Sequence, residues 1–318
     1  MVAVAGGSAC GIGVTPNLVS RHDSGSDPPP SVDWGAGDAA PAGPVGPPCA
    51  SSAPFVRVAK VPGLDFVGEG ISSARFSPDE LVAYLGINVD GVIHIAISAR
   101  RSRAEPFSVP APLSAVNSPS AGGTMDDGFP TVTSDGLTMY LHSARTGAYK
   151  LYTAQRSFAG AEFSRPAELT SLNVFGEGDP FVTSDDGALY FHSWRTGDQP
   201  DLYRAKIGRD GFDSPRLLAE LASGAVEYAP VVEPGELAIY YFSNRADRAG
   251  PGIWTATRTS MDVSFGPSIR LPMGVVGTNV LEVPNWISPD RCRLYFTALD
   301  DLLPSRLYVA ERAPLPAR

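Results

Sequence analysis

The sequence predicts an all-β fold, a five-bladed β-propeller of four-stranded blades, and three observations lead to this prediction. A pattern of short apolar runs and turns recurs five times between residues 54 and 313. Glycine (33 residues) and proline (30) are abundant and charged residues make up only 19% of the chain, a balance typical of turn-rich β proteins. The last copy of the pattern lacks its final strand, and a matching segment precedes the first copy.

Each copy of the pattern contains the runs expected for the strands of one blade. The first runs read "ARFSPDEL", "PTVTSDGL", "PFVTSDDG", "PVVEPGEL" and "PNWISPDR". The second runs centre on tyrosines spaced 56, 50, 50 and 55 residues apart: Tyr84, Tyr140, Tyr190, Tyr240 and Tyr295. The third runs read "HIAIS", "LYTAQ", "LYRAK", "IWTAT" and "LYVAE", and fourth segments containing Phe and Pro follow the first four. Four short strands at a period near 50 are typical of propeller blades, which must stack to bury both faces of each sheet.

The two ends of the repeat region complement each other. The fifth copy stops after its third run, "SRLYVAERA", whereas "PFVRVAKVPGL" at 54–64 aligns with the fourth segment "EFSRPAELTSL" at 162–172. We therefore expect residues 55–64 to lie beside residues 307–311, where they complete the last blade and close the ring. This closure favours five blades over the alternative of six.

The N-terminal segment, residues 1–53, differs in composition from the propeller at 54–318. It is dominated by Gly, Pro, Ala, Ser and Asp, so it cannot bury enough apolar surface to offset its ordering entropy, and we predict a disordered tether. Its start, "MVAVAGGSACG", resembles the end of a bacterial lipoprotein signal, which would make Cys10 the lipidated residue. Cys10 could instead pair with Cys49 and leave Cys292 alone, or all three thiols could be unpaired.

The charge of the chain restricts its partners. The formal net charge is −9 with no basic run, so nucleic acid and anionic membrane surfaces are not expected to bind. No apolar stretch reaches 18 residues, which predicts no membrane span and leaves a lipid anchor as the only membrane attachment considered. The cysteine spacing does not support a zinc site, and we expect no cofactor and a monomer.

Two charged positions recur where the loops of one face, the top face, should meet the channel. Asp127, Glu177 and Glu227 stand three residues before the prolines that open the first runs, and Glu69 and Glu282 are their counterparts in the first and fifth copies. Arginines end the second runs of three copies, each in a Ser-x-Arg sequence: Arg145, Arg195 and Arg245.

Neighbouring carboxylates about 8 Å apart would repel by roughly 2 kcal/mol at an effective dielectric near 20. The arginines could offset this repulsion by pairing with the acids of the same or the neighbouring blade. Alternatively, the acids could form a funnel that accepts a cation, a sugar or a basic peptide. Because structural devices recur in every blade and catalytic ones usually do not, the pairing is the preferred interpretation.

Residues that break the repeat are better candidates for chemistry. Asp179 stands beside Pro180, without a counterpart in the other copies, and Trp194 could stack on a sugar or a partner side chain. His142 and His192 recur 50 residues apart, but no third metal ligand accompanies them, so we predict structural histidines and no metal site.

The runs "FSPDE", "TSDGLTMYLHSAR", "TSDDGALYFHSWR" and "SPDRCRLYF" resemble the TolB-type propeller repeat over residues 54–313. Familiar members of that family are bacterial envelope proteins that bind protein partners at the propeller mouth, although TolB itself has six blades of shorter period. The resemblance implies a non-catalytic, extracytoplasmic module, periplasmic or on the outer surface, with a protein, peptide or glycan partner.

The rival interpretation is a carbohydrate-active enzyme, because five-bladed propellers also house furanosidases with three carboxylates in the channel. In that case Asp127, Asp179 and Glu227 are the catalytic candidates. A glycosidase needs two carboxyl groups about 5.5 or 6.5–9.5 Å apart, so unpaired acids around an open pocket would favour the enzyme.

Overall fold

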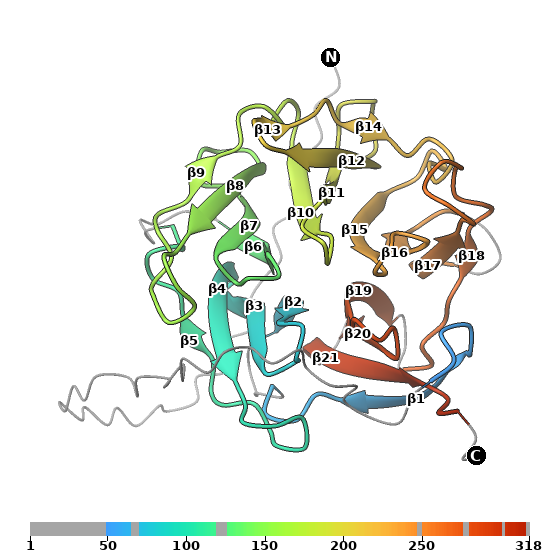
Figure 1. Cartoon of the computed structure of the whole chain (residues 1–318), viewed down its shortest axis with the longest axis horizontal. Coiled ribbons are helices and arrows are strands. Elements are labelled where there is room, and N and C mark those ends of the chain that lie inside the picture. The colour runs from blue at the N-terminus through green and yellow to red at the C-terminus, as the bar shows by residue number, and fades with distance from the viewer. Residues whose placement is uncertain are drawn as a thin grey trace, which may run out of the picture. The chain divides into compact units, whose positions relative to one another are not determined.

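Five antiparallel sheets form a ring in the computed structural model, which describes residues 49–64, 70–118, 126–246, 250–275, 280–300 and 303–315 (Figure 1). Consecutive sheets follow one another around a common axis, with the first strand of each sheet nearest the centre. The prediction of a five-bladed propeller of four-stranded blades is confirmed. The predicted tether up to residue 48, with Cys10, and the acid Glu69 lie outside the described residues.

The strands follow the predicted runs. The first blade contains β2 (Ile71–Phe76), β3 (Val82–Val89), β4 (Val92–Ala99) and β5 (Ala111–Pro112). The second contains β6 (Asp127–Val132), β7 (Thr138–Ser143), β8 (Lys150–Gln155) and β9 (Ala167–Glu168). The third contains β10 (Glu177–Val182), β11 (Ala188–Ser193), β12 (Asp201–Gly208) and β14 (Arg216–Leu217), with β13 (Gly211–Phe212) paired to the end of β12. The fourth contains β15 (Glu227–Val232), β16 (Ala238–Ser243), β17 (Gly252–Thr257) and β18 (Ile269–Arg270).

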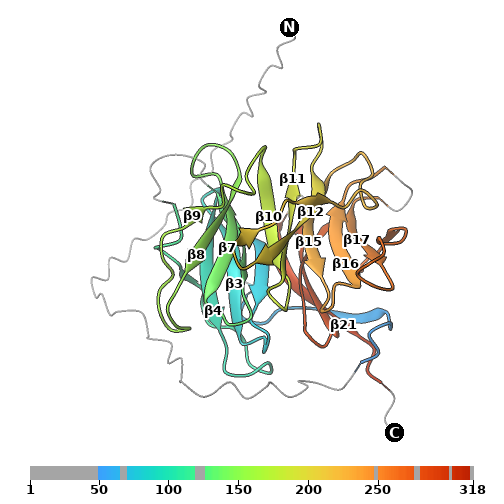
Figure 2. The same ribbon diagram turned by 45° about the horizontal axis from the view of Figure 1, so that its top comes forward.

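The fifth blade combines both ends of the propeller. It contains β19 (Leu281–Ile287), β20 (Arg293–Asp300), β21 (Leu303–Arg312) and, as its outer strand, β1 (Phe55–Lys60). Strand β1 runs antiparallel to β21, and Val58 and Lys60 face Ala310 and Tyr308 in the register. The two strands lie side by side although more than 240 residues separate them in the sequence (Figures 1 and 2). The predicted closure is confirmed.

The turn between the first two strands of each blade explains the recurring Ser/Thr-x-Asp sequence. In the second blade the Thr133 hydroxyl donates to Asp135 at 2.6 Å, and the same Asp135 oxygen accepts the backbone N–H of Leu137 at 2.9 Å. These bonds pair the polar groups of the turn within the turn itself. The residue after the aspartate takes a left-handed conformation, which only Gly136 adopts without steric cost (φ 72°).

In the other blades a non-glycine residue occupies this left-handed position, where it contacts the preceding blade. These contacts join Glu80 to Arg293 and Tyr295, Asp186 to Ser134, Glu236 to Arg204 and Tyr190, and Arg291 to the Pro234 carbonyl. Polar bonds at this turn position therefore hold four of the five blades to the one before.

The apolar core lies between blades, because each sheet buries both faces against its neighbours. The largest cluster of buried residues joins the third, fourth and fifth blades through Tyr190, Tyr241 and Phe296, which are fully buried. A second cluster joins the second and third blades through Leu151 and Phe191. Apolar side chains therefore lie on both faces of the sheets and pack between neighbouring blades.

A disulfide joins Cys49 to Cys292 across 243 residues. Both predictions for these cysteines, a Cys10–Cys49 pair and unpaired thiols, are wrong. The physical reason is ring closure: the segment that leads into β1 lies at the end of the fifth blade, where Cys49 bridges to Pro314 and Cys292 precedes β20. Structural disulfides persist in oxidising compartments, which indicates an extracytoplasmic environment. Within the described ranges, no helix is long and apolar enough to cross a membrane.

Removing the disulfide should destabilise the ring, because the crosslink restricts the unfolded chain over a long loop. We expect Cys292→Ser to lower the free energy of unfolding by about 2–4 kcal/mol in urea titrations. Cys49→Ser should lose the same amount, and dithiothreitol should destabilise the wild type but neither variant. An unchanged urea midpoint in Cys292→Ser would show that β1 pairing alone closes the ring.

Candidate functional site

The predicted acids begin the first strands of three blades, and arginines of the same blades bind them. Asp127, Glu177 and Glu227 stand at the starts of β6, β10 and β15 and are fully buried. Their pairings are Asp127 with Arg145 at 2.7 Å, Glu177 with Arg195 at 3.0 Å, and Glu227 with Arg245 at 3.3 Å.

Each of these arginines is held in the same way, which explains the Ser-x-Arg sequence. Arg195 donates from Nε to the Ser193 hydroxyl at 2.9 Å and from Nη2 to the Leu172 carbonyl at 2.7 Å. Its guanidinium also stacks on the ring of Tyr203 at 4.8 Å. The other two arginines repeat these contacts in their own blades. The clamp therefore ties the loop that enters each blade to its first two strands.

In the fifth blade an arginine also binds the acid at the start of the first strand, but this arginine lies on a different strand. Glu282 pairs with Arg270 at 3.3 Å and accepts the backbone N–H of Met273 at 3.1 Å. Glu69 lies outside the described residues. The four described acids are thus bound by arginine, as in the pairing interpretation, and do not form an open acidic funnel.

Asp179, the acid that breaks the repeat, occupies a bulge of β10 and is 3% exposed. It has a positive φ of 52° and accepts the backbone N–H of Ala229 from the fourth blade at 3.1 Å. The Nδ1 atoms of His142 and His192 lie 3.1 and 3.2 Å from its two oxygens. Burial acts to raise the pKa of Asp179, but the charge of His192 and the hydrogen bond to His142 outweigh it, so this pKa lies well below its usual value.

The two histidines fit because glycines face them on the first strands. Gly128 pairs with His142 in the register and Gly178 with His192. A Cβ on Gly128 would lie 2.6 Å from His142 Nε2, and one on Gly178 would lie 2.5 Å from His192 Cε1. Each of the two repeated histidines therefore requires a glycine opposite it on the first strand. No group of three His, Cys, Asp or Glu side chains that could hold a metal ion occurs in the described part of the chain.

Sequence analysis did not identify Arg75, the most unusual residue near the axis. Arg75 is 1% exposed on β2, and its Nε and Nη2 have no hydrogen-bond partner among the described residues. Its guanidinium lies 5.9 and 5.2 Å from the ring centres of Phe129 and Phe181, on the inner strands of the second and third blades. Burial lowers its pKa to about 9, and the nearby charge of Asp179 opposes the shift.

A signal for Arg75 was present in the repeat. It pairs with Tyr84 in the register, and the residues opposite the equivalent tyrosines in the other blades are uncharged: Thr131, Phe181, Val231 and Trp286. The strand registers of the five blades must be aligned before it becomes visible that an arginine occupies this mostly apolar position.

Four exposed apolar side chains, here called the apical patch, lie on the loops of the second and third blades. They are Tyr149, Val174, Phe175 and Trp194, with exposed fractions of 41%, 58%, 66% and 43%. The Glu177 N–H donates to the Tyr149 carbonyl at 3.2 Å and the Trp194 N–H to the Gly176 carbonyl at 3.3 Å, so the three loops are adjacent. Contiguous exposed apolar side chains typically mark a binding surface. Of these residues, sequence analysis identified only Trp194.

No family model and no curated protein sequence matches this chain. Solved structures match its fold. A thermostable family-43 glycoside hydrolase aligns with a TM-score of 0.55 at 14% identity, covering 80% of this chain and 98% of the other. A glycosyl hydrolase from Bacteroides ovatus aligns with a TM-score of 0.51 at 12% identity, covering 86% and 97%. A putative TolB from Agrobacterium tumefaciens aligns with a TM-score of 0.48 at 18% identity, covering 76% and 74%. At these identities the hydrolase alignments establish a shared fold.

Replacing Arg75 should stabilise the protein, because its burial leaves two donors without partners. We expect Arg75→Leu, which places an apolar residue where other blades have Phe181 or Val231, to raise the free energy of unfolding by about 1–3 kcal/mol. Urea titration measures the change, and Arg209→Leu on an exposed turn is the control. A loss of stability instead would mean that water or a ligand satisfies the guanidinium.

Asp179 should make stability depend on pH in the acidic range. A folded-state pKa below the unfolded value of about 3.9 gives stability that is present above that pH and is lost as the pH falls towards the folded pKa. We expect Asp179→Asn to be about 1–3 kcal/mol less stable than wild type at pH 7. Its urea midpoint should also change less than that of wild type between pH 5 and pH 2.

The matched control for this experiment is Asp262→Asn, since Asp262 is exposed. It should reproduce the wild-type pH profile. A wild-type profile in Asp179→Asn as well would show that the folded structure does not lower the pKa of this carboxylate.

Proposed function

We propose that this chain is a non-catalytic, extracytoplasmic propeller that binds a protein or peptide partner of the cell envelope through the apical patch. The observation that carries this proposal is the burial of the rim carboxylates in arginine clamps. Asp127 and Glu227 are fully buried, and their oxygens accept bonds from Arg145 and Arg245. A general acid or base must reach the group with which it exchanges a proton, and these two do not.

The composition of the apical patch supports a protein partner. Aromatic side chains are enriched in the buried centres of protein interfaces, where they contribute much of the binding energy. Phe175 and Trp194 are exposed on neighbouring loops, and the Tyr149 hydroxyl donates to Asp126 at 2.8 Å beside them. An apolar surface with a carboxylate at its edge suits a partner that presents an apolar side chain next to a basic one.

The Cys49–Cys292 disulfide supports the extracytoplasmic part of the proposal, because the thiols of a reducing compartment would keep these two cysteines reduced. Lipid anchoring through Cys10 and a monomeric state belong to the same proposal. The mass of the mature N-terminus tests the anchor, and sedimentation equilibrium tests the monomer.

A glycoside hydrolase of furanosidase type is the second candidate, and Asp179 is the observation that favours it. This carboxylate lies on an inner strand, outside the arginine clamps, and its low pKa keeps it ionised as a nucleophile or base requires. The second carboxyl group that hydrolysis needs is missing from the proposed trio, because Asp127 and Glu227 are both bound by arginine.

Truncating an aromatic side chain of the apical patch should weaken partner binding without affecting the fold. We expect Phe175→Ala and Trp194→Ala each to weaken binding by about tenfold or more, since aromatic anchors typically contribute at least 1.4 kcal/mol. The partner is first identified by crosslinking to wild-type protein in envelope extract and is then purified for calorimetry. Phe158→Ala, which removes an exposed aromatic ring from a loop between β8 and β9, is the matched control and should bind like wild type.

Equal binding by the Phe175, Trp194 and Phe158 variants would contradict the proposed surface. Turnover of arabinan or an aryl-furanoside that is lost in Asp179→Asn would contradict the non-catalytic assignment and favour the second candidate.

A further inference from the structure

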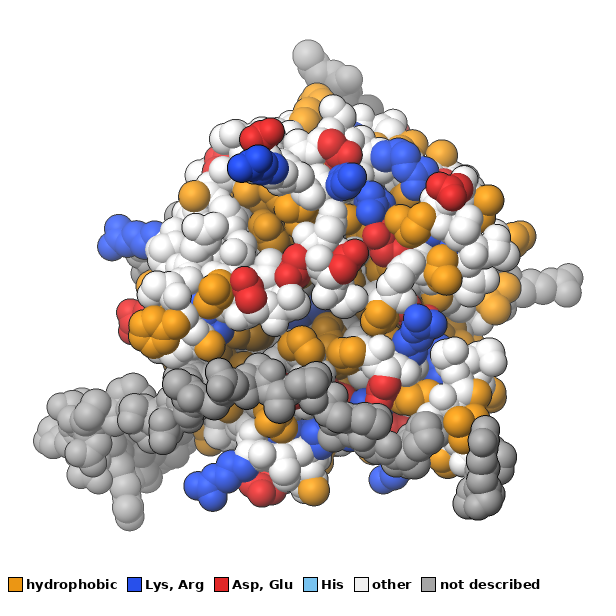
Figure 3. All heavy atoms as spheres, in the orientation of Figure 1, with side chains coloured by type: hydrophobic (Ala, Val, Ile, Leu, Met, Phe, Trp, Pro, Cys, Tyr) orange, Lys and Arg blue, Asp and Glu red, His pale blue; other side chains and the backbone are white. Residues whose placement is uncertain are grey.

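A basic pocket lies at the junction of the first and fifth blades, away from the apical patch. Its volume is about 610 Å³, and it is formed by β1, the start of β20, the end of β21, the turn at Glu80 and the loop after β4. Acidic and basic side chains are interspersed over the face of the ring in Figure 3, so no single charge sign covers that face. The pocket differs, because one sign of charge dominates it.

Among the described residues, six basic side chains line the pocket against two carboxylates. The basic residues are Arg57, Lys60, Arg100, Arg103, Arg293 and Arg312, and the acids are Glu80 and Glu311. Lys60 has an interaction of its own, and the five arginines alone exceed the two carboxylates by three positive charges. Asp290 and Glu233 contact Arg293 and Arg312 from outside the lining, at 2.8 and 3.1 Å, and with these two acids included the five arginines still exceed the carboxylates by one positive charge. This surplus occurs in a chain with a formal net charge of −9.

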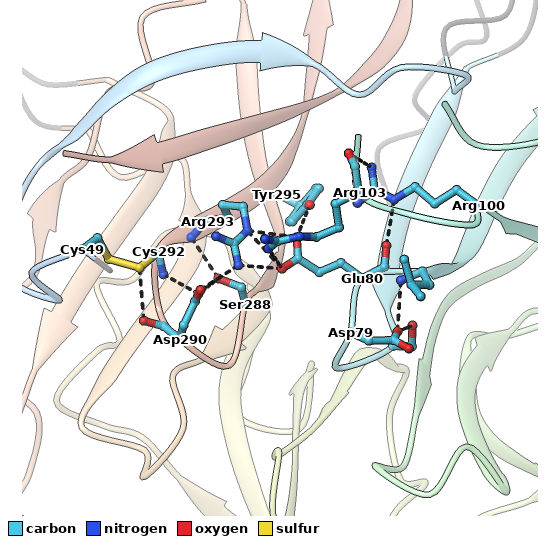
Figure 4. A network of polar contacts seen from close by, with 12 residues as sticks. Cys49, Asp79, Glu80, Arg100, Arg103, Ser288, Asp290, Cys292, Arg293 and Tyr295 are labelled. Atoms are coloured by element: carbon cyan, nitrogen blue, oxygen red, sulfur yellow. Dashed lines mark hydrogen bonds and ion pairs between the residues drawn. A yellow bond between two sulfur atoms is a disulfide. The ribbon is translucent and has the colours of Figure 1, made fainter. Parts of the chain in front are cut away.

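Glu80 holds three of the basic side chains in place and leaves one buried donor of Arg103 without a partner. Its carboxylate accepts bonds from Arg293 at 2.6 Å, Arg103 at 3.0 Å and the Tyr295 hydroxyl at 2.5 Å, and its carbonyl accepts from Arg100 Nε at 2.9 Å. Figure 4 shows the three arginines converging on this residue. One carboxylate thus binds two guanidinium groups, and the buried Nε of Arg103 has no partner among the described residues.

The arrangement is fixed before any ligand arrives. Arg100 stacks on Phe107 at 4.4 Å and donates to the Arg103 carbonyl at 3.3 Å, so the loop after β4 holds its own arginines in place. The disulfide partners Cys49 and Cys292 also line the pocket. A preorganised site loses less conformational entropy on binding than a flexible one.

We propose that this pocket binds a small anionic ligand that carries phosphate or carboxylate groups. Arginine forks match the planar or tetrahedral oxygens of such groups in two-point hydrogen bonds. Arg57 contributes from the open edge, where its side chain is 75% exposed and pairs with Glu311 at 3.3 Å. Val56, Val61, Pro62 and Val309 supply apolar wall, and the volume suits a ligand of two or three sugar-sized units.

Calorimetric titration of the full, oxidised chain with pyrophosphate, trigalacturonate and neutral maltotriose tests the proposal. We expect pyrophosphate or trigalacturonate to bind saturably and maltotriose not to bind. Which anion binds more tightly distinguishes a phosphate ligand from a carboxylate ligand. Arg103→Gln should weaken binding by about tenfold or more, because it removes charged hydrogen-bond donors.

Arg57→Gln keeps the test decisive if Arg103→Gln disturbs the fold, since Arg57 is exposed and its ion pair contributes little stability. This variant should weaken binding by about three- to tenfold. Arg209→Gln, which removes an exposed arginine elsewhere, should bind like wild type. No saturable binding of either anion, an equal loss in Arg209→Gln, or equal binding of maltotriose would overturn the proposal.

Discussion

Closure of the ring is the constraint on which the rest of this structure depends. A blade buries its two faces only against neighbours, so an open row of five would expose one face at each end. The pairing of β1 with β21 completes the last sheet, and the Cys49–Cys292 disulfide holds the entering chain to the same blade. The first and fifth blades meet only because the ring closes. Their junction then creates the basic pocket, which neither blade contains alone.

Within the closed ring, charged residues that recur from blade to blade have a different role from charged residues that occur in one blade. The acids that begin the first strands and the arginines that end the second strands recur with the period of the blades, and they neutralise each other in buried clamps. Asp179 and Arg75 each occur in one blade, near the axis; the two histidines lower the pKa of Asp179 against the effect of burial, and burial lowers the pKa of Arg75. Recurring charges thus stabilise the scaffold, while single departures create unusual electrostatic environments.

The two candidate binding surfaces follow from the same scaffold. On the top face of the second and third blades, Phe175 and Trp194 lie on loops that leave their side chains exposed to solvent. In the first blade, Glu80 occupies the left-handed turn position, which in the third, fourth and fifth blades serves contacts with the preceding blade. Here the same position also gathers arginines around a pocket. The surfaces differ in chemistry, one aromatic and one cationic, so they suit different partners.

The sequence by itself determined the strand runs, the number of blades, the closure by residues 55–64 and the placement of Trp194 at the loops of the top face. These features rest on local periodicity and on repeats that align with one another, which a single sequence displays. Only the tertiary structure decided the partner of Cys49, the isolation of the Arg75 guanidinium and the gathering of Arg57 and Arg103 in one pocket. Each of these depends on distances between residues far apart in the chain, and such distances are set by the radius and closure of the ring rather than by any local pattern.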